Sequence, residues 1–167
     1  MTINIIVAVG KKNEIGCNNN LLANIPEDMK YFRETTKNSI VIMGRKALES
    51  LPNGNPLKGR INIVITKQKI SKDNVIVVDS IEKSIEVAKK LSEAEGREVF
   101  VIGGGSIYEQ FMDKADKLYI THLFEEFEAD TYFPEISEEV WELEEVKADV
   151  ENIKCNIPHI FAIYKRK

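Results

Sequence analysis

Glu98-Val99-Phe100-Val101-Ile102-Gly103-Gly104-Gly105-Ser106-Ile107-Tyr108 joins an apolar run of strand length to three consecutive glycines and then to a helical pattern. Glycine lacks the Cβ that hinders close approach of a ligand, and a helix start presents unpaired N–H groups to an anion. We interpret this loop as a phosphate cradle; the alternative is a tight strand-to-helix turn with nothing bound. Tyr108 occupies the third glycine position of a G-x-G-x-x-G fingerprint, so an ordinary Rossmann domain fits poorly.

Length and composition restrict the class of protein. The 167 residues suit a single domain over 1–167, which can bury a core without disulfides or metals. A net charge of −4 argues against a general nucleic-acid binder. Cys17 and Cys155 lie far apart, and His122 and His159 form no ligand motif, which favours reduced thiols and no metal site. Without a signal peptide or an apolar run of ~20 residues, we expect a soluble cytoplasmic protein.

Short β-branched runs alternate with helical patterns, which predicts an α/β fold. The expected strands cover residues 3–9, 39–43, 61–66, 75–78, 99–102 and 117–123. One helix is predicted from Ile81 to Glu95, with Ser80 as N-cap and Gly96 as its stop, and another from 26 to 35. After Thr121 we predict no helix, but antiparallel strands near 141–146 and 157–164.

Three predicted strands end in groups suited to phosphate. One runs into Gly44-Arg45-Lys46, one into Lys67-Gln68-Lys69, and one into the glycine loop. Ligands of open α/β sheets gather beyond the carboxyl ends of strands. If these strands are parallel neighbours, their ends would suit a pyrophosphate with a 2′-phosphate beside it; otherwise each basic cluster is ordinary solvated surface.

The helix expected from Pro26 carries a carboxylate on its inner side. Ile25, Met29, Phe32 and Thr36 share one stripe at helical spacing, and Asp28 falls close to it. Burying a carboxylate costs several kcal/mol unless it is paired or used. We therefore interpret Asp28 as a partner for a planar nitrogenous ligand, whereas the plainer alternative is a first-turn acid that complements the helix dipole.

These residues together resemble the bacterial chromosomal-type dihydrofolate reductases. The resemblance runs from Ile3 to near the C-terminus and is carried by Ala8, Ile15-Gly16, Pro26-Glu27-Asp28, Phe32, Val41-Ile42-Met43-Gly44-Arg45, Leu57-Lys58-Gly59-Arg60, Val101 to Gly105, Tyr108-Glu109, Tyr119-Ile120-Thr121 and Asp130 to Pro134. It implies an eight-stranded, mostly parallel sheet with an antiparallel C-terminal edge and four flanking helices. It also implies NADPH-dependent reduction of 7,8-dihydrofolate to tetrahydrofolate, which supports one-carbon and thymidylate metabolism.

The resemblance assigns a role to each part of the substrate pocket. Asp28 is similar to the carboxylate that holds the pteridine and promotes protonation at N5, with Thr121 bonded to it. Arg60 is similar to the arginine that takes the glutamate α-carboxylate of the substrate. The positions that correspond to substrate contacts are Ile6, Ala8, Leu21, Phe32, Leu51, Leu57, Arg60 and Ile102.

The cofactor positions follow in the same way. They are Ala8, Ile15 and Gly16 at the nicotinamide; Gly44, Arg45, Lys46, Ala47, Thr66 and Lys67 around the 2′-phosphate; and Gly103, Gly104, Gly105, Ser106, Ile107 and Tyr108 at the pyrophosphate. The family has a cis Gly-Gly bond in the pyrophosphate loop, and residues 18–24 correspond to its mobile active-site loop. Diaminopyrimidine and pteridine antifolates are the implied inhibitors, and a monomer is the implied state.

Some positions depart from the family pattern. Ala23 replaces a nearly universal tryptophan, Leu22 a usual proline and Ala47 a common threonine. Two other functions stay open: a related NADPH-dependent pyrimidine reductase of riboflavin synthesis, which would not need Asp28 or Arg60, and a non-catalytic nucleotide-binding domain.

Overall fold

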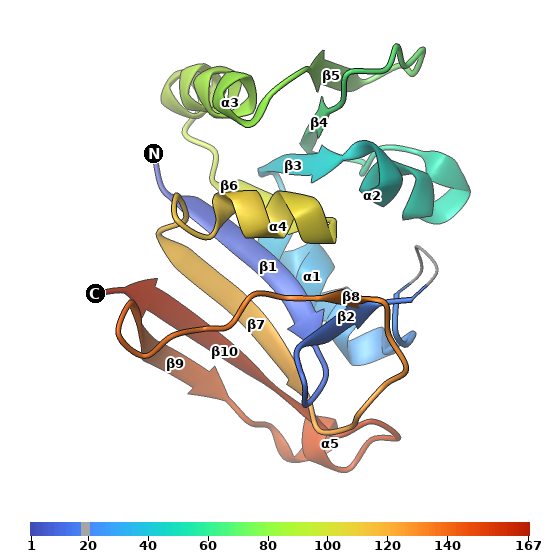
Figure 1. Cartoon of the computed structure of the whole chain (residues 1–167), viewed down its shortest axis with the longest axis vertical. Helices are drawn as coiled ribbons and strands as arrows, with labels where there is room; N and C mark the ends of the chain where they lie inside the picture. Colours follow the sequence, from blue (N-terminus) through green and yellow to red (C-terminus); the bar gives the residue numbers. More distant parts are fainter. Residues whose placement is uncertain (18–20) are drawn as a thin grey trace.

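An eight-stranded sheet forms the middle of the molecule in the computed structural model, which describes residues 1–17 and 21–167 (Figure 1). Its strand order is β5-β4-β3-β6-β1-β7-β10-β9. The strands are β1 (Ile3–Val9), β3 (Ile40–Gly44), β4 (Ile61–Ile65), β5 (Val75–Val78), β6 (Val99–Gly103), β7 (Lys117–Leu123), β9 (Trp141–Lys147) and β10 (His159–Arg166). The strands from β5 through β4, β3, β6 and β1 to β7 all pair in parallel. Strand β10 then pairs antiparallel with β7, and β9 pairs antiparallel with β10, as predicted.

Four helices flank this sheet, as expected, and a fifth short one was not predicted. They are α1 (Pro26–Thr36), α2 (Arg45–Ser50), α3 (Ile81–Glu95), α4 (Gly105–Phe111) and α5 (Val150–Ile153). The expectation of no helix after Thr121 is therefore wrong by one turn. That turn is closed by the N–H groups of Asn152 and Ile153, which donate to the Asp149 carbonyl, and it is too short to leave a periodic apolar pattern.

The capping signals of α3 are confirmed. The Lys83 N–H donates to Ser80 Oγ at 3.0 Å, and Gly96 ends the helix with φ +67°. A second small sheet of β2 (Glu14–Gly16) and β8 (Thr131–Tyr132) was not predicted. Its strands are too short for an alternating pattern.

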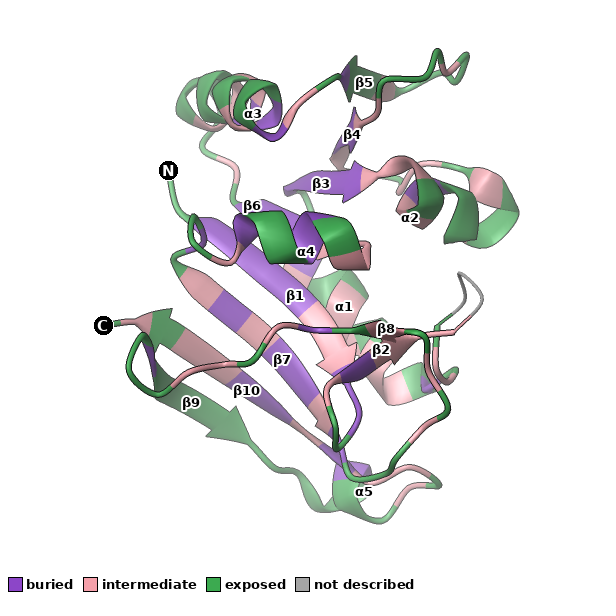
Figure 2. Cartoon of the chain, viewed as in Figure 1, coloured by how far each residue is buried: buried purple, intermediate pink, exposed green. Residues whose placement is uncertain are grey.

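Strands in the interior of the sheet are more buried than the edge strand β9 (Figure 2). Residues 40–43 of β3 are fully buried, because this strand lies between β4 and β6 with apolar side chains on both faces. At the outer edge, β9 is exposed from Glu142 onward and carries charged side chains that discourage pairing with another chain. In the part of the chain that the structure describes, no helix is both long and apolar enough to cross a membrane.

Candidate active site

The three strand ends singled out for phosphate chemistry lie side by side. Strand β3 pairs in parallel with β4 on one side and with β6 on the other, and Met43 stands opposite both Val64 and Gly103. Arg45 follows β3 directly, and Thr66 follows β4. The predicted meeting of a basic cluster, a second basic cluster and a glycine loop at one sheet edge is therefore confirmed.

The glycine loop has the close-packed form that a phosphate cradle requires. Gly103 has φ +124°, and a Cβ there would approach the Tyr108 ring to 3.3 Å. The Gly103–Gly104 peptide bond is cis, as the resemblance implied. A Cβ on Gly104 would instead meet nothing within 4 Å, so the outer side of the loop is open to a ligand. The buried Tyr108 connects the start of α4 to β1, because its hydroxyl donates a hydrogen bond to the Ile6 carbonyl at 2.9 Å.

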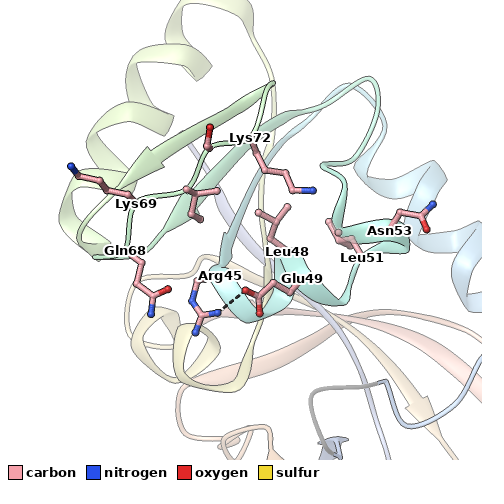
Figure 3. Close-up of a pocket in the computed structure, with 11 residues that line it drawn as sticks. Arg45, Leu48, Glu49, Leu51, Asn53, Gln68, Lys69 and Lys72 are labelled. Atoms are coloured by element: carbon pink, nitrogen blue, oxygen red, sulfur yellow. Dashed lines mark hydrogen bonds and ion pairs between the residues drawn. The ribbon is translucent and has the colours of Figure 1, made fainter.

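Basic residues follow the neighbouring ends of β3 and β4. Arg45 Nη1 lies 2.6 Å from Glu49 Oε1, one turn further along α2 (Figure 3). Lys46 and Lys67 are exposed, and Thr66 Oγ1 accepts a hydrogen bond from the Gln68 N–H at 3.1 Å. A hollow of about 680 Å³ lies between α2 and the 68–72 loop. Figure 3 shows the residues that line it. Arg45 and Gln68 belong to its lining, so the hollow adjoins the expected 2′-phosphate site.

Asp28 is bonded to Thr121 across the molecule. Thr121 Oγ1 donates to Asp28 Oδ1 at 2.6 Å, although 93 residues separate them. Burial raises the pKa of Asp28, and the Thr121 hydrogen bond opposes this shift by favouring the carboxylate. Thr121 lies on β7 opposite Ala8 of β1, which places the acid beside the strand that the resemblance assigns to both ligands.

The predicted inner stripe of α1 is correct except at one residue. Phe32 is half-buried and Thr36 is buried, but Met29 is 43% exposed. The helix is attached to the sheet through Asp28, which bonds to Thr121 of β7, and through Tyr31, which stacks on Phe161 of β10. Most of the predicted apolar substrate contacts share one cluster, namely Ile6, Phe32, Leu51, Leu57 and Ile102. Leu21 is 76% exposed and stays apart from it.

Two hydrogen bonds orient the Arg60 side chain. Its Nη1 donates to Thr36 Oγ1 at 3.2 Å and its Nε to the Lys58 carbonyl at 3.0 Å. Partial burial lowers the pKa of Arg60, and the nearby Arg33 adds to the effect. Arg33 was not among the site residues predicted from the sequence.

The two residues predicted beside Ala8 at the nicotinamide are on β2. Ile15 and Gly16 lie on this strand, and the Asp130 N–H donates to the Gly16 carbonyl at 3.0 Å. Of the predicted active-site loop over 18–24, residues 18–20 lie outside the described residues. Among the described residues, no group of three or more His, Cys, Asp or Glu side chains could hold a metal ion.

Comparison with known proteins agrees with this geometry. The dihydrofolate reductase family model matches residues 2–166. The chain belongs to the dihydrofolate reductase family. It is 40% identical over 144 residues to dihydrofolate reductase of Haemophilus influenzae, covering 86% of each chain. It is 38% identical over 167 residues to that of Staphylococcus haemolyticus, covering 99% of this chain and 96% of the relative.

A solved dihydrofolate reductase structure has the same fold. The Enterococcus faecalis enzyme, complexed with NADP(H) and RAB-propyl, superposes with a TM-score of 0.86 at 31% identity. The match covers 99% of this chain and 96% of that one. The dihydrofolate reductase fold predicted from the sequence is therefore confirmed over nearly the whole chain.

Proposed function

We propose that the protein catalyses the NADPH-dependent reduction of 7,8-dihydrofolate to 5,6,7,8-tetrahydrofolate. The observation that carries this proposal is the 2.6 Å hydrogen bond from Thr121 to Asp28, a partly buried carboxylate on the same helix as Phe32 of the apolar cluster. Family membership supports the same reaction. The enzyme would thereby supply tetrahydrofolate to one-carbon and thymidylate metabolism.

Asp28 would orient the pteridine and promote protonation at N5. A carboxylate can accept hydrogen bonds from the planar N–H groups of that ring, and Thr121 fixes its orientation. Burial raises the pKa of Asp28 towards the range in which a group can assist proton transfer at neutral pH. NADPH would supply the hydride that reaches C6 of the substrate.

The residues around the glycine loop fit a dinucleotide phosphate. The open backbone at Gly104 leaves room for the pyrophosphate, and the start of α4 offers unpaired N–H groups to it. Arg45 follows β3, and Thr66 and Lys67 follow β4. These residues would offer two charged donors and one hydroxyl donor to a 2′-phosphate. Lys46 would compensate for the hydroxyl that is missing at Ala47.

The apolar cluster and Arg60 complete the substrate site. Phe32, Leu51 and Leu57 would line the pteridine and benzoyl rings, and Arg60 would bind the glutamate α-carboxylate as a bidentate pair. Diaminopyrimidine and pteridine antifolates would occupy the same pocket. We further propose that the enzyme acts as a cytoplasmic monomer without a nucleic-acid partner.

One assay separates this function from its alternatives. The decrease in NADPH absorbance is followed with dihydrofolate and, separately, with the pyrimidine intermediate of riboflavin synthesis. We expect oxidation with dihydrofolate alone. Oxidation with the pyrimidine would support the riboflavin-type reductase, and NADPH binding without oxidation of either substrate would support a non-catalytic domain; both results would overturn the proposal.

A further inference from the structure

Glu14 is a buried carboxylate that the proposed chemistry does not use. It begins β2, directly before Ile15 and Gly16, and only 2% of it is exposed. Its Oε2 accepts a hydrogen bond from the Phe127 N–H at 2.7 Å, and its Oε1 accepts one from the Lys12 N–H. One side chain therefore joins the turn after β1 to a segment more than a hundred residues away.

The surroundings of Glu14 are shaped for a charged carboxylate. Burial by itself raises the pKa of Glu14, but the backbone N–H groups of Phe127 and Lys12 outweigh this effect and lower the pKa. Space for the carboxylate is left by Gly10, where a Cβ would come within 2.7 Å of Glu14 Oε2 and 2.9 Å of the Phe127 ring. The ionised form is thus the one that the local backbone accommodates.

The segment tied down by Glu14 lies against both halves of the cofactor site. The 125–133 segment meets β2 through the bond from the Asp130 N–H to the Gly16 carbonyl, 3.0 Å long. It also meets the phosphate loop, because a Cβ on Gly105 would lie 2.5 Å from Thr131 Cγ2 and 4.0 Å from Ile15 Cδ1. The side chains of Thr131 and Ile15 therefore both lie close to Gly105.

We propose that Glu14 is a positioning residue that holds Ile15 and Gly16 in place for the nicotinamide end of the cofactor. The inference rests on the proposed function, because it concerns the same cofactor. An ionised carboxylate accepts from two N–H groups on opposite sides, whereas a neutral amide presents its own N–H₂ group to one of them. Removing the charge therefore releases one of the two attachments and leaves β2 less firmly placed.

The test compares Glu14→Gln with a chemically matched control. Asp116 is an exposed residue whose Oδ2 accepts from the Ile3 N–H at 2.8 Å at the opposite end of β1, so Asp116→Asn removes a carboxylate that also binds a backbone N–H, but far from the site. Measured quantities are the hydride-transfer rate in a single turnover, the Kd of NADPH, and the Kd of adenosine 2′,5′-bisphosphate, which lacks the nicotinamide.

For Glu14→Gln we expect hydride transfer to fall and the Kd of NADPH to rise, each roughly tenfold, the factor that corresponds to one lost charge-assisted hydrogen bond. The Kd of adenosine 2′,5′-bisphosphate should stay the same, and Asp116→Asn should change none of the three. If Glu14→Gln does not fold, Gly10→Ala displaces the same carboxylate and should give the same pattern.

Two results would overturn the proposal. Equal loss of affinity for NADPH and for the bisphosphate would indicate a general structural role, and unchanged values in both Glu14→Gln and Gly10→Ala would indicate no role. A wild-type protein that binds NADPH but does not oxidise it with dihydrofolate would instead overturn the proposed function, and the comparison of the two Kd values would still test Glu14.

Discussion

The Tyr31 ring of α1 lies flat on the Phe161 ring of β10, with 4.0 Å between centroids and 13° between planes. Phe161 is the cross-strand partner of Thr121, which in turn holds Asp28, three residues before Tyr31 on α1. The helix is therefore attached to the sheet at two points within one turn. Burial at this contact also raises the pKa of the Tyr31 phenol to about 12, so its ring stays neutral.

The first prediction concerns the rate of reduction. Asp28→Asn should reduce the rate with dihydrofolate at neutral pH by at least about a hundredfold, within the range expected when a group that assists proton transfer is lost. The rate should recover partly as the pH falls, because substrate protonated in solution no longer needs the acid. Glu27→Gln serves as control, since Glu27 lies beside Asp28 without the bond to Thr121. A pH profile of the Asn variant parallel to that of the wild type would contradict the assignment.

The second prediction concerns stability at the same position. Because burial raises the pKa of Asp28, the folded protein binds this proton more tightly than the unfolded chain. Stability from this group is thus fully present below the unfolded pKa and is lost as the pH rises through the folded pKa. We expect Asp28→Asn to unfold at a higher Tm than the wild type at neutral pH, with the difference vanishing at acidic pH. Calorimetry across the pH range measures this, and a lower Tm of the variant at neutral pH would argue against a costly buried charge.

The third prediction concerns the choice of cofactor. Arg45→Ala should raise the Kd of NADPH by roughly tenfold to a hundredfold, since a hydrogen bond to a charged group contributes about 1.5 to 3 kcal/mol. The Kd of NADH, which lacks the 2′-phosphate, should hardly change. Fluorescence titration with both cofactors measures the two values. Equal weakening of NADPH and NADH binding would remove Arg45 from the 2′-phosphate site.

The fourth prediction concerns Glu49, whose Oε1 forms an ion pair with Arg45 Nη1 at 2.6 Å (Figure 3). This partner competes with an incoming phosphate, so Glu49→Gln should tighten NADPH about two- to fivefold at low salt, the range of an exposed ion pair. High salt should diminish the gain because it screens exposed charges. NADH affinity is the internal control. Tightening of both cofactors would point to a change in the adenosine contacts rather than in Arg45.

The fifth prediction concerns recognition of the glutamate tail. Arg60→Lys keeps the positive charge but loses the planar pair of donors, so the KM for dihydrofolate should rise roughly tenfold with kcat unchanged. A dihydropteridine that lacks the glutamate should react equally with both enzymes. Lys58→Ala, at the exposed neighbouring position, is the matched control. A fall in kcat without a change in KM would contradict this role.

Much of the sheet could be predicted from the sequence because buried parallel strands read as continuous apolar runs bounded by turns. The strand ends with Arg45 and Thr66 were therefore placed correctly before the order of strands was known. Strand β2 and helix α5 were not predicted because a segment of three or four residues is too short to show a periodic pattern of apolar residues. The exposure of Met29 was not predicted, because the spacing of apolar residues along α1 defines one face of the helix but not how much of that face the sheet covers.

The role of Glu14 could not be read from the sequence for a different reason. Its partners are backbone N–H groups, and one of them, on Phe127, becomes a neighbour only through the return of the chain after β7. A contact between a side chain and the main chain leaves no complementary residue type at the second position. Arg45 and Glu49, in contrast, sit one helical turn apart, where charge spacing indicates the pair directly.

The short helix α2 has a consequence for how the two ligands influence each other. It starts at Arg45, beside the proposed cofactor phosphate, and ends just before Leu51 of the apolar cluster proposed to line the substrate, a span of about 9 Å. Leu48 between them is 2% exposed and fixes the helix in the core. Because Arg45 and Leu51 are joined by this one rigid helix, any change in its position on binding one ligand also changes the proposed site of the other. Thermodynamic linkage then requires the two affinities to change by the same factor, whichever ligand arrives first.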